Sequence, residues 1–112
     1  MSFTYHMVPC EYFEAQSQDK PYRPEPMVAG REEFIHCTDG EQNLADTGNR
    51  FYKGDPRPFY ALLLDLEKLT SPFKYEDNAR IFPHIYGALN REAIIAVLPF
   101  PRAEDGTFLP PA

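Results

Sequence analysis

Hydrophobic and polar side chains alternate near the start of the chain, and longer apolar runs follow. Over residues 4–8, Tyr5 and Met7 fall on one face and their neighbours on the other, which is typical of a short strand. Continuous apolar runs at residues 59–66 and 93–100 have the length of strands, and they predict two strands buried in a sheet. Further strands are predicted at residues 33–37, 73–76 and 82–86.

Apolar positions at helical spacing predict two helices. The first covers residues 9–18 and begins with a proline, which suits the first turn of a helix. The second begins at a capping box, with Thr38 as N-cap and Glu41 three residues later, and Gly54 ends it. Residues 19–30 carry three prolines, so we expect a surface loop there without a regular helix.

The 112 residues are enough for one hydrophobic core, and we expect a single domain over residues 1–112. Twelve prolines indicate many fixed turns, and Asp105-Gly106 predicts a hairpin-type turn near the end of the chain. Many short strands, two or three short helices and no regular alternation between them predict the α+β class.

The charge balance excludes two classes of partner. Eleven basic and seventeen acidic residues give a net charge of −6, whereas nucleic-acid binding needs a basic surface and anionic membranes repel an acidic one. No apolar run is long enough to span a bilayer, and the first residues lack the pattern of a signal peptide. We therefore expect a cytoplasmic protein in which Cys10 and Cys37 are reduced thiols.

The three histidines occupy distinctive positions. His6 falls in the first predicted strand, His36 ends the second one just before a predicted helix, and His84 shares a strand face with Tyr86. A helix N-terminus offers free N–H groups to an anion such as phosphate, which predicts an anion site at Thr38. The alternative is that Thr38 only caps the helix.

Metal and thiol chemistry have weaker support in the sequence. No Cys-x-x-Cys or His-x-x-x-His spacing is present, and His36 and Cys37 point to opposite faces of a strand, so we predict no metal site. Cys10 in the first turn of a helix, with His6 nearby, is the better candidate for a nucleophile. The alternative for both cysteines is a buried structural thiol.

Several short blocks together resemble the bacterial family catalogued as domain of unknown function 952. They keep their order along nearly the whole chain, and one departure is Glu32-Glu33 where the family usually has Glu-Gly. The blocks are Tyr5-His6-Met7-Val8, Phe34-Ile35-His36-Cys37-Thr38, Glu41-Gln42, Asn49-Arg50-Phe51-Tyr52, Phe82-Pro83-His84-Ile85-Tyr86-Gly87 and Asp105-Gly106-Thr107-Phe108.

This resemblance implies a fold similar to that of the ADP-ribosyltransferases and the RNA 2′-phosphotransferases, in which split antiparallel sheets hold NAD in a cleft. It implies that His6 contacts a ribose and that the helix start at Thr38 holds the phosphates. Tyr52 or Tyr86 would then stack on the nicotinamide. The acid of the family pattern would be Glu76 or Glu104.

Two hypotheses about function follow. In the first, the protein binds NAD or a related nucleotide and transfers ADP-ribose, with His36 and His84 as the catalytic groups that donate and accept protons. In the second, the same fold is a non-catalytic module that binds a small ligand or another protein. A weaker third hypothesis is a metal-dependent hydrolase that uses the histidines with an acid. The oligomeric state stays open.

Overall fold

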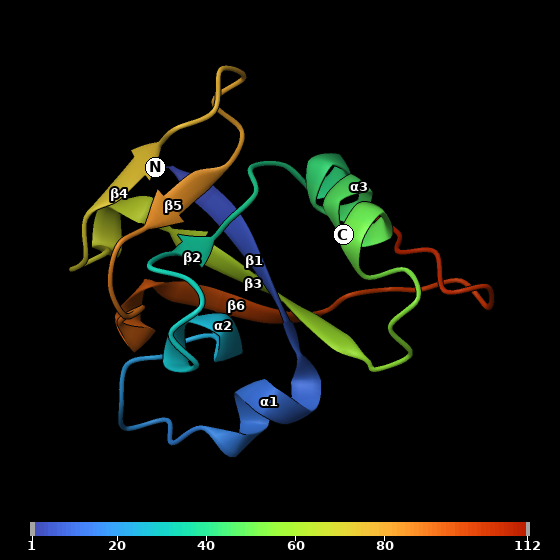
Figure 1. Cartoon of the computed structure of the whole chain (residues 1–112), viewed down its shortest axis with the longest axis horizontal. Coiled ribbons are helices and arrows are strands. Elements are labelled where there is room, and N and C mark those ends of the chain that lie inside the picture. The colour runs from blue at the N-terminus through green and yellow to red at the C-terminus, as the bar shows by residue number, and fades with distance from the viewer. Residues whose placement is uncertain (1, 112) are drawn as a thin grey trace.

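Two small antiparallel sheets frame the protein, for which a computed structural model describes residues 2–111 (Figure 1). The larger sheet has the order β1-β3-β6, and the smaller one has the order β2-β5-β4. The strands are β1 (Phe3–Pro9), β2 (Ile35–His36), β3 (Phe59–Asp65), β4 (Phe73–Tyr75), β5 (Pro83–Ile85) and β6 (Ile94–Pro99). Every strand lies at a predicted position, and β3 is the central strand of its sheet as its apolar run predicts.

The helices are short and lie between the strands. They are α1 (Cys10–Ala15), α2 (Glu25–Val28) and α3 (Glu41–Phe51), with single 3-10 turns η1 (Leu66–Lys68) and η2 (Arg91–Ala93). Together with the two sheets they confirm the α+β class. Within residues 2–111, none of these helices has the length and apolar character that a membrane span requires.

The central strand of the larger sheet, β3, contributes to a hydrophobic core on each face. One face of β3 contributes Leu62 and Leu64 to a core that also holds Ile35 and Ile85 of the smaller sheet. The other face contributes Phe59 and Ala61 to a second core, which α3 and the C-terminal segment close with Leu44 and Phe108. Because successive residues of a strand point to opposite faces, the apolar run of β3 serves both cores at once.

A short bridge joins the two sheets and corrects the predicted capping box. The Tyr5 amide donates to the Thr38 carbonyl over 2.9 Å, and the Thr38 amide donates to the Tyr5 carbonyl over 2.8 Å. Thr38 is thus extended and buried, and α3 starts at Glu41 with Gly40 as its N-cap and no side-chain cap. The prediction of Thr38 as N-cap is wrong, because its backbone pairs with β1 instead of entering the helix.

Four other features differ from the predictions. The helix predicted at residues 9–18 ends at Ala15, and α3 ends at Phe51, before Gly54. A single helical turn, α2, occurs in the predicted loop, because Pro26 lies in its first turn, where proline is tolerated. β6 lies at the sheet edge and is only half-buried, so the prediction of a fully buried strand is wrong there.

A C-terminal hairpin packs beside α3. The Gly106 amide donates to the Ala103 carbonyl over 3.0 Å, and Gly106 adopts a φ of 93°, which favours glycine. The predicted turn at Asp105-Gly106 is therefore confirmed. Arg102 fastens this hairpin to the loop before β3, donating to the carbonyls of Lys53, Asp55, Arg57 and Gly106.

Candidate functional site

His36 and His84 lie directly opposite each other on β2 and β5. Their ring centroids are 5.3 Å apart, and the rings meet edge to face at 78°. The His36 side chain is 61% exposed and the His84 side chain 20% exposed. The antiparallel register thus brings two histidines that are 48 positions apart in sequence onto one open face of the smaller sheet.

Each histidine has its own carboxylate partner. The Nε2 atom of His36 lies 3.2 Å from Oε1 of Glu32, and the Nδ1 atom of His84 lies 3.1 Å from Oε1 of Glu76. A carboxylate bonded to one ring nitrogen orients an imidazole and fixes which nitrogen carries the proton. One nitrogen of each ring takes part in these two contacts, so the pair resembles two oriented acid–base groups.

Glu76 also accepts a hydrogen bond from the hydroxyl of Tyr86. That bond, together with the one from His84, lowers the pKa of Glu76 below its usual value. The same bond raises the pKa of Tyr86, because the phenol loses a favourable interaction when it ionises. Glu76 is therefore a carboxylate held between two side chains that the sequence analysis selected.

Aromatic rings surround the histidine pair. The Phe34 ring stacks on His84 with centroids 4.0 Å apart at 17°, and it lies 5.4 Å from the Tyr86 ring. The Lys74 ammonium lies 5.5 Å from the centre of the Tyr86 ring. These residues share a face because strand residues two apart point the same way. We call the set of Glu32, Phe34, His36, Lys74, Glu76, His84 and Tyr86 the histidine face.

His6 lies beneath this face and not on it. It is 7% exposed, its Nδ1 atom lies 2.7 Å from the His36 carbonyl oxygen, and its Nε2 atom lies 2.9 Å from the hydroxyl of Tyr22. Since a carbonyl only accepts, Nδ1 carries the proton and Nε2 accepts from Tyr22. Burial lowers the pKa of His6 to about 4, so the ring is neutral at pH 7. The ribose contact of His6 stays a prediction, and it requires one of these two bonds to open.

Other predicted residues lie away from the histidine face. Thr38 is buried at the bridge to β1. Tyr52 follows α3 and packs on Phe59 with ring centroids 5.4 Å apart, in the region of the second core. Glu104 belongs to the C-terminal hairpin and is exposed. The sequence offered Tyr52 or Tyr86 as the stacking ring and Glu76 or Glu104 as the acid. Of these four residues, Tyr86 and Glu76 lie beside His36 and His84.

The two cysteines are free thiols and are poorly suited to nucleophilic chemistry. Cys37 is fully buried, and burial raises its pKa. Cys10 is half-buried, and burial with the nearby Glu14 carboxylate raises its pKa as well. A raised pKa keeps the thiol protonated, which favours the interpretation of both cysteines as structural thiols.

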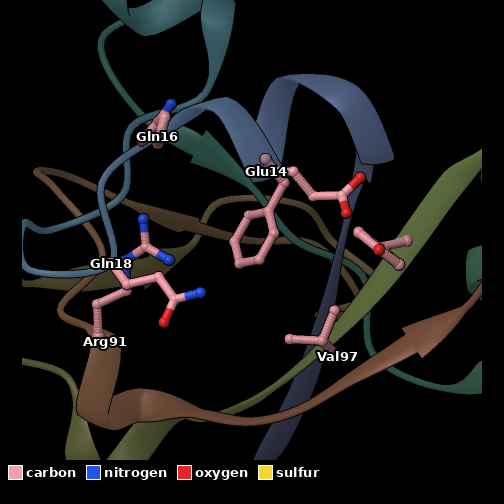
Figure 2. A pocket seen from close by; sticks show the side chains of 7 residues that line it. Glu14, Gln16, Gln18, Arg91 and Val97 are labelled. Atoms are coloured by element: carbon pink, nitrogen blue, oxygen red, sulfur yellow. The ribbon is translucent and has the colours of Figure 1, made fainter.

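Within residues 2–111, no group of three or more histidine, cysteine and carboxylate side chains is arranged to hold a metal ion. The histidine face is an open surface, and two hollows lie elsewhere. One, of about 600 Å³, lies between the Arg57 loop and the C-terminal hairpin. The other, of about 410 Å³, lies between α1 and β6, with Glu14, Gln18, Arg91 and Val97 around it (Figure 2).

Sequence reasoning missed four residues around the histidines. The spacing in the sequence could have revealed three of them. Phe34 and Glu32 precede His36 by two and four positions, and Lys74 precedes Glu76 by two positions. Tyr22 has no such signal, because it lies among prolines and reaches His6 only through the packing of its loop.

Comparisons with known proteins support the fold. The family model described as protein of unknown function (DUF952) matches residues 7–97. Two crystal structures of the protein CC0527 from Caulobacter crescentus, one of them a double mutant, are similar to this chain with a TM-score of 0.77. Their identities are 18% and 17%, over 96% of this chain and 94% of that chain. None of the curated proteins matches the chain.

Proposed function

Because the chain belongs to the DUF952 family, whose function is unknown, we propose an activity from the histidine face itself. We propose that this face binds NAD or a related nucleotide and that the protein transfers ADP-ribose. In this proposal the two antiparallel sheets hold the nucleotide in the manner of an ADP-ribosyltransferase. The observation that carries the proposal is the clustering of His36, His84, Tyr86 and Glu76 on one exposed face.

The charges and rings of the face suit the nicotinamide end of NAD. The face and its border carry three carboxylates, Glu32, Glu33 and Glu76, against the single ammonium of Lys74. The nicotinamide ring of NAD is a planar cation, which aromatic faces and carboxylates attract. The half-buried Phe34 and Tyr86 rings offer such a stacking surface, whereas Tyr52 packs on Phe59 in the region of the second core.

The histidines supply the proton transfers that the reaction needs. In ADP-ribosyl transfer, the bond between ribose C1′ and the nicotinamide nitrogen breaks, and its electron pair stays with the nicotinamide. A lone pair of the acceptor forms the new bond to C1′, and the acceptor proton passes to the free ring nitrogen of His36 or His84. The Glu32 and Glu76 carboxylates stabilise the imidazolium that results.

Nuclear magnetic resonance (NMR) titration tests the binding step. Isotope-labelled protein is titrated with NAD while the side-chain signals of His6, His36 and His84 are followed. We expect saturable shifts at His36 and His84, and a smaller shift at His6, whose ring reaches the histidine face through the backbone carbonyl of His36. Transfer is then tested with labelled NAD and purified acceptors, by the release of nicotinamide.

Matched variants separate the histidine face from the other candidates. Tyr86→Ala and Glu76→Gln should weaken binding about tenfold or more, whereas Tyr52→Ala and Glu104→Gln should leave it unchanged. Equal losses in all four variants would contradict the assignment to this face. Circular dichroism of each variant controls for folding.

The openness of the face favours one alternative, a non-catalytic interaction module. A face with half-buried rings and an exposed histidine, outside the two hollows, suits a protein partner as well as a nucleotide. The absence of any histidine shift at millimolar NAD would contradict nucleotide binding and support this alternative.

A further inference from the structure

β6 forms an open edge of the larger sheet. It pairs with β3 on one side, and within the described residues no strand pairs with its other side. The Phe100 amide donates to the Phe59 carbonyl, and bonded pairs alternate with non-bonded ones along an antiparallel ladder. Leu98 therefore bonds to β3, while the amide and carbonyl of Val97 point outward, away from the sheet.

This edge carries little of the usual protection against pairing, namely a register shift at Ile95, opposite Leu63 and Leu64, and the proline that ends β6. Exposed edge strands normally carry charged side chains or prolines that prevent another strand from adding. Between Ile94 and Pro99 no residue is charged, and the Ile95 and Val97 side chains are each 44% exposed. Only the last residue, Pro99, lacks an N–H group.

We propose that β6 pairs antiparallel with β6 of a second copy of this chain, so that the two larger sheets form one continuous six-stranded sheet. A two-fold axis beside Val97 makes the edge self-complementary, because each Val97 amide donates to the Val97 carbonyl of the other copy. In this register Ile95 faces Pro99 of the second copy. Pro99 has no N–H group, and its place at the end of the paired segment leaves the hydrogen bonds at Val97 intact.

Charge and shape at the ends of the strand support a second copy as the occupant. An antiparallel pair places the start of one β6 beside the end of the other. The exposed Glu92, just before β6, then lies on the side of Arg102 of the second copy, just after its β6. The Arg102 N–H groups already bond backbone carbonyls, so the support is the opposite charge of the two strand ends and not a new ion pair. On the sheet face, Val97 borders the hollow between α1 and β6, so the Val97 side chain of the second copy adds an apolar wall there (Figure 2).

The oligomeric state tests this proposal. Light scattering after size exclusion is measured between about 10 µM and about 1 mM, a range that covers weak association. We expect a reversible shift from one chain to two. Val97→Lys should weaken the dimer at least about tenfold, because it places like charges opposite each other at the axis. Val28→Lys is the matched control, since Val28 is 65% exposed on α2, and it should leave dimerisation unchanged.

Hydrogen exchange adds a readout that needs no substitution. The Val97 amide should exchange quickly in dilute protein and slowly in concentrated protein, while the Leu98 amide, bonded to β3, stays protected in both. The proposal would be overturned if Val97→Lys still formed the dimer while, in the unsubstituted chain, the Val97 amide exchanged quickly at high concentration. A chain that stays monomeric with unchanged Val97 exchange would overturn it too, and the edge would then be left to an extended segment of another protein.

Discussion

The hydroxyl of Tyr22 donates a hydrogen bond to Nε2 of His6 over 2.9 Å, with both side chains buried. The other ring nitrogen, Nδ1, donates to the carbonyl of His36, which belongs to the strand of the exposed histidine pair. The buried histidine thus holds in place the backbone from which His36 projects. Stability and site geometry are coupled through this one imidazole.

We predict that His6 makes the protein less stable as the pH falls from about 6.5 to about 4. Burial lowers the pKa of folded His6 to about 4 from the ordinary histidine value of 6.5, so the unfolded chain binds the proton more readily in this range. The contribution of neutral His6 to the free energy of unfolding is full above pH 6.5. The difference between the folded and unfolded pKa corresponds to a loss of about 3 kcal/mol, complete below pH 4. Urea unfolding at several pH values measures it. NMR titration of the ring gives the pKa of folded His6 directly, and a value near 6.5 would contradict the prediction.

Tyr22→Phe should destabilise the fold by about 1–3 kcal/mol, because it leaves the buried Nε2 of His6 without a donor. Tyr12→Phe is the control, since the Tyr12 hydroxyl donates to the Arg23 carbonyl at an exposed position. We expect that change to cost no more than about 1 kcal/mol. Chemical unfolding of both variants compares them, and similar costs would argue against the buried bond.

Gly48→Ala should destabilise the protein although alanine is the better helix former by about 1 kcal/mol. A Cβ atom at Gly48 would lie 2.9 Å from Cδ2 of Phe108, in the tightly packed second core. Overpacking of this kind costs about 1–3 kcal/mol. Gly54→Ala meets no atom within 4 Å and should be neutral or slightly stabilising. Thermal unfolding of the two variants decides the point, and an unchanged midpoint for Gly48→Ala would contradict it.

Arg102→Lys should loosen the C-terminal hairpin and cost about 1–3 kcal/mol. The Arg102 guanidinium donates to four backbone carbonyls and lies 4.1 Å from the centre of the Phe108 ring, a geometry that an ammonium does not reproduce. Arg57→Lys, at an exposed pair with Asp55, should cost less than about 1 kcal/mol. Hydrogen exchange at Gly106 and Leu109 reports the loosening, and unchanged exchange would refute it.

Local patterns were sufficient wherever a segment's neighbours in sequence decide its structure. The alternation around Tyr5, the apolar run that became β3 and the turn at Asp105-Gly106 were predicted correctly. Their conformation follows from side-chain period and turn chemistry, which act over a few residues. The same two-residue period of a strand places His36 and Cys37 on opposite faces. The structure confirms this, because His36 is exposed and Cys37 is buried.

Local patterns failed where a distant segment competes for the same backbone. Thr38 matches a capping box in sequence, yet its amide and carbonyl pair with Tyr5, 33 positions away. A buried backbone group must be satisfied, and a strand partner from another part of the chain satisfies both groups of Thr38 at once. β6 likewise lies at an edge because of strand order, which its own composition does not encode.

The candidate site divides in the same way. The sequence by itself determined the α+β class of the fold and the short set of histidines, tyrosines and carboxylates worth considering, and it left the role of the cysteines open. Only the tertiary structure decided among them. The register of β2, β5 and β4 gathers Tyr86 and Glu76 around His36 and His84, and it leaves Tyr52 and Glu104 elsewhere. A separate backbone bridge to Leu89 holds Tyr22, whose hydroxyl bonds His6. These choices depend on contacts between segments far apart in sequence, whose pairing is set by burial of the whole core and not by any local pattern.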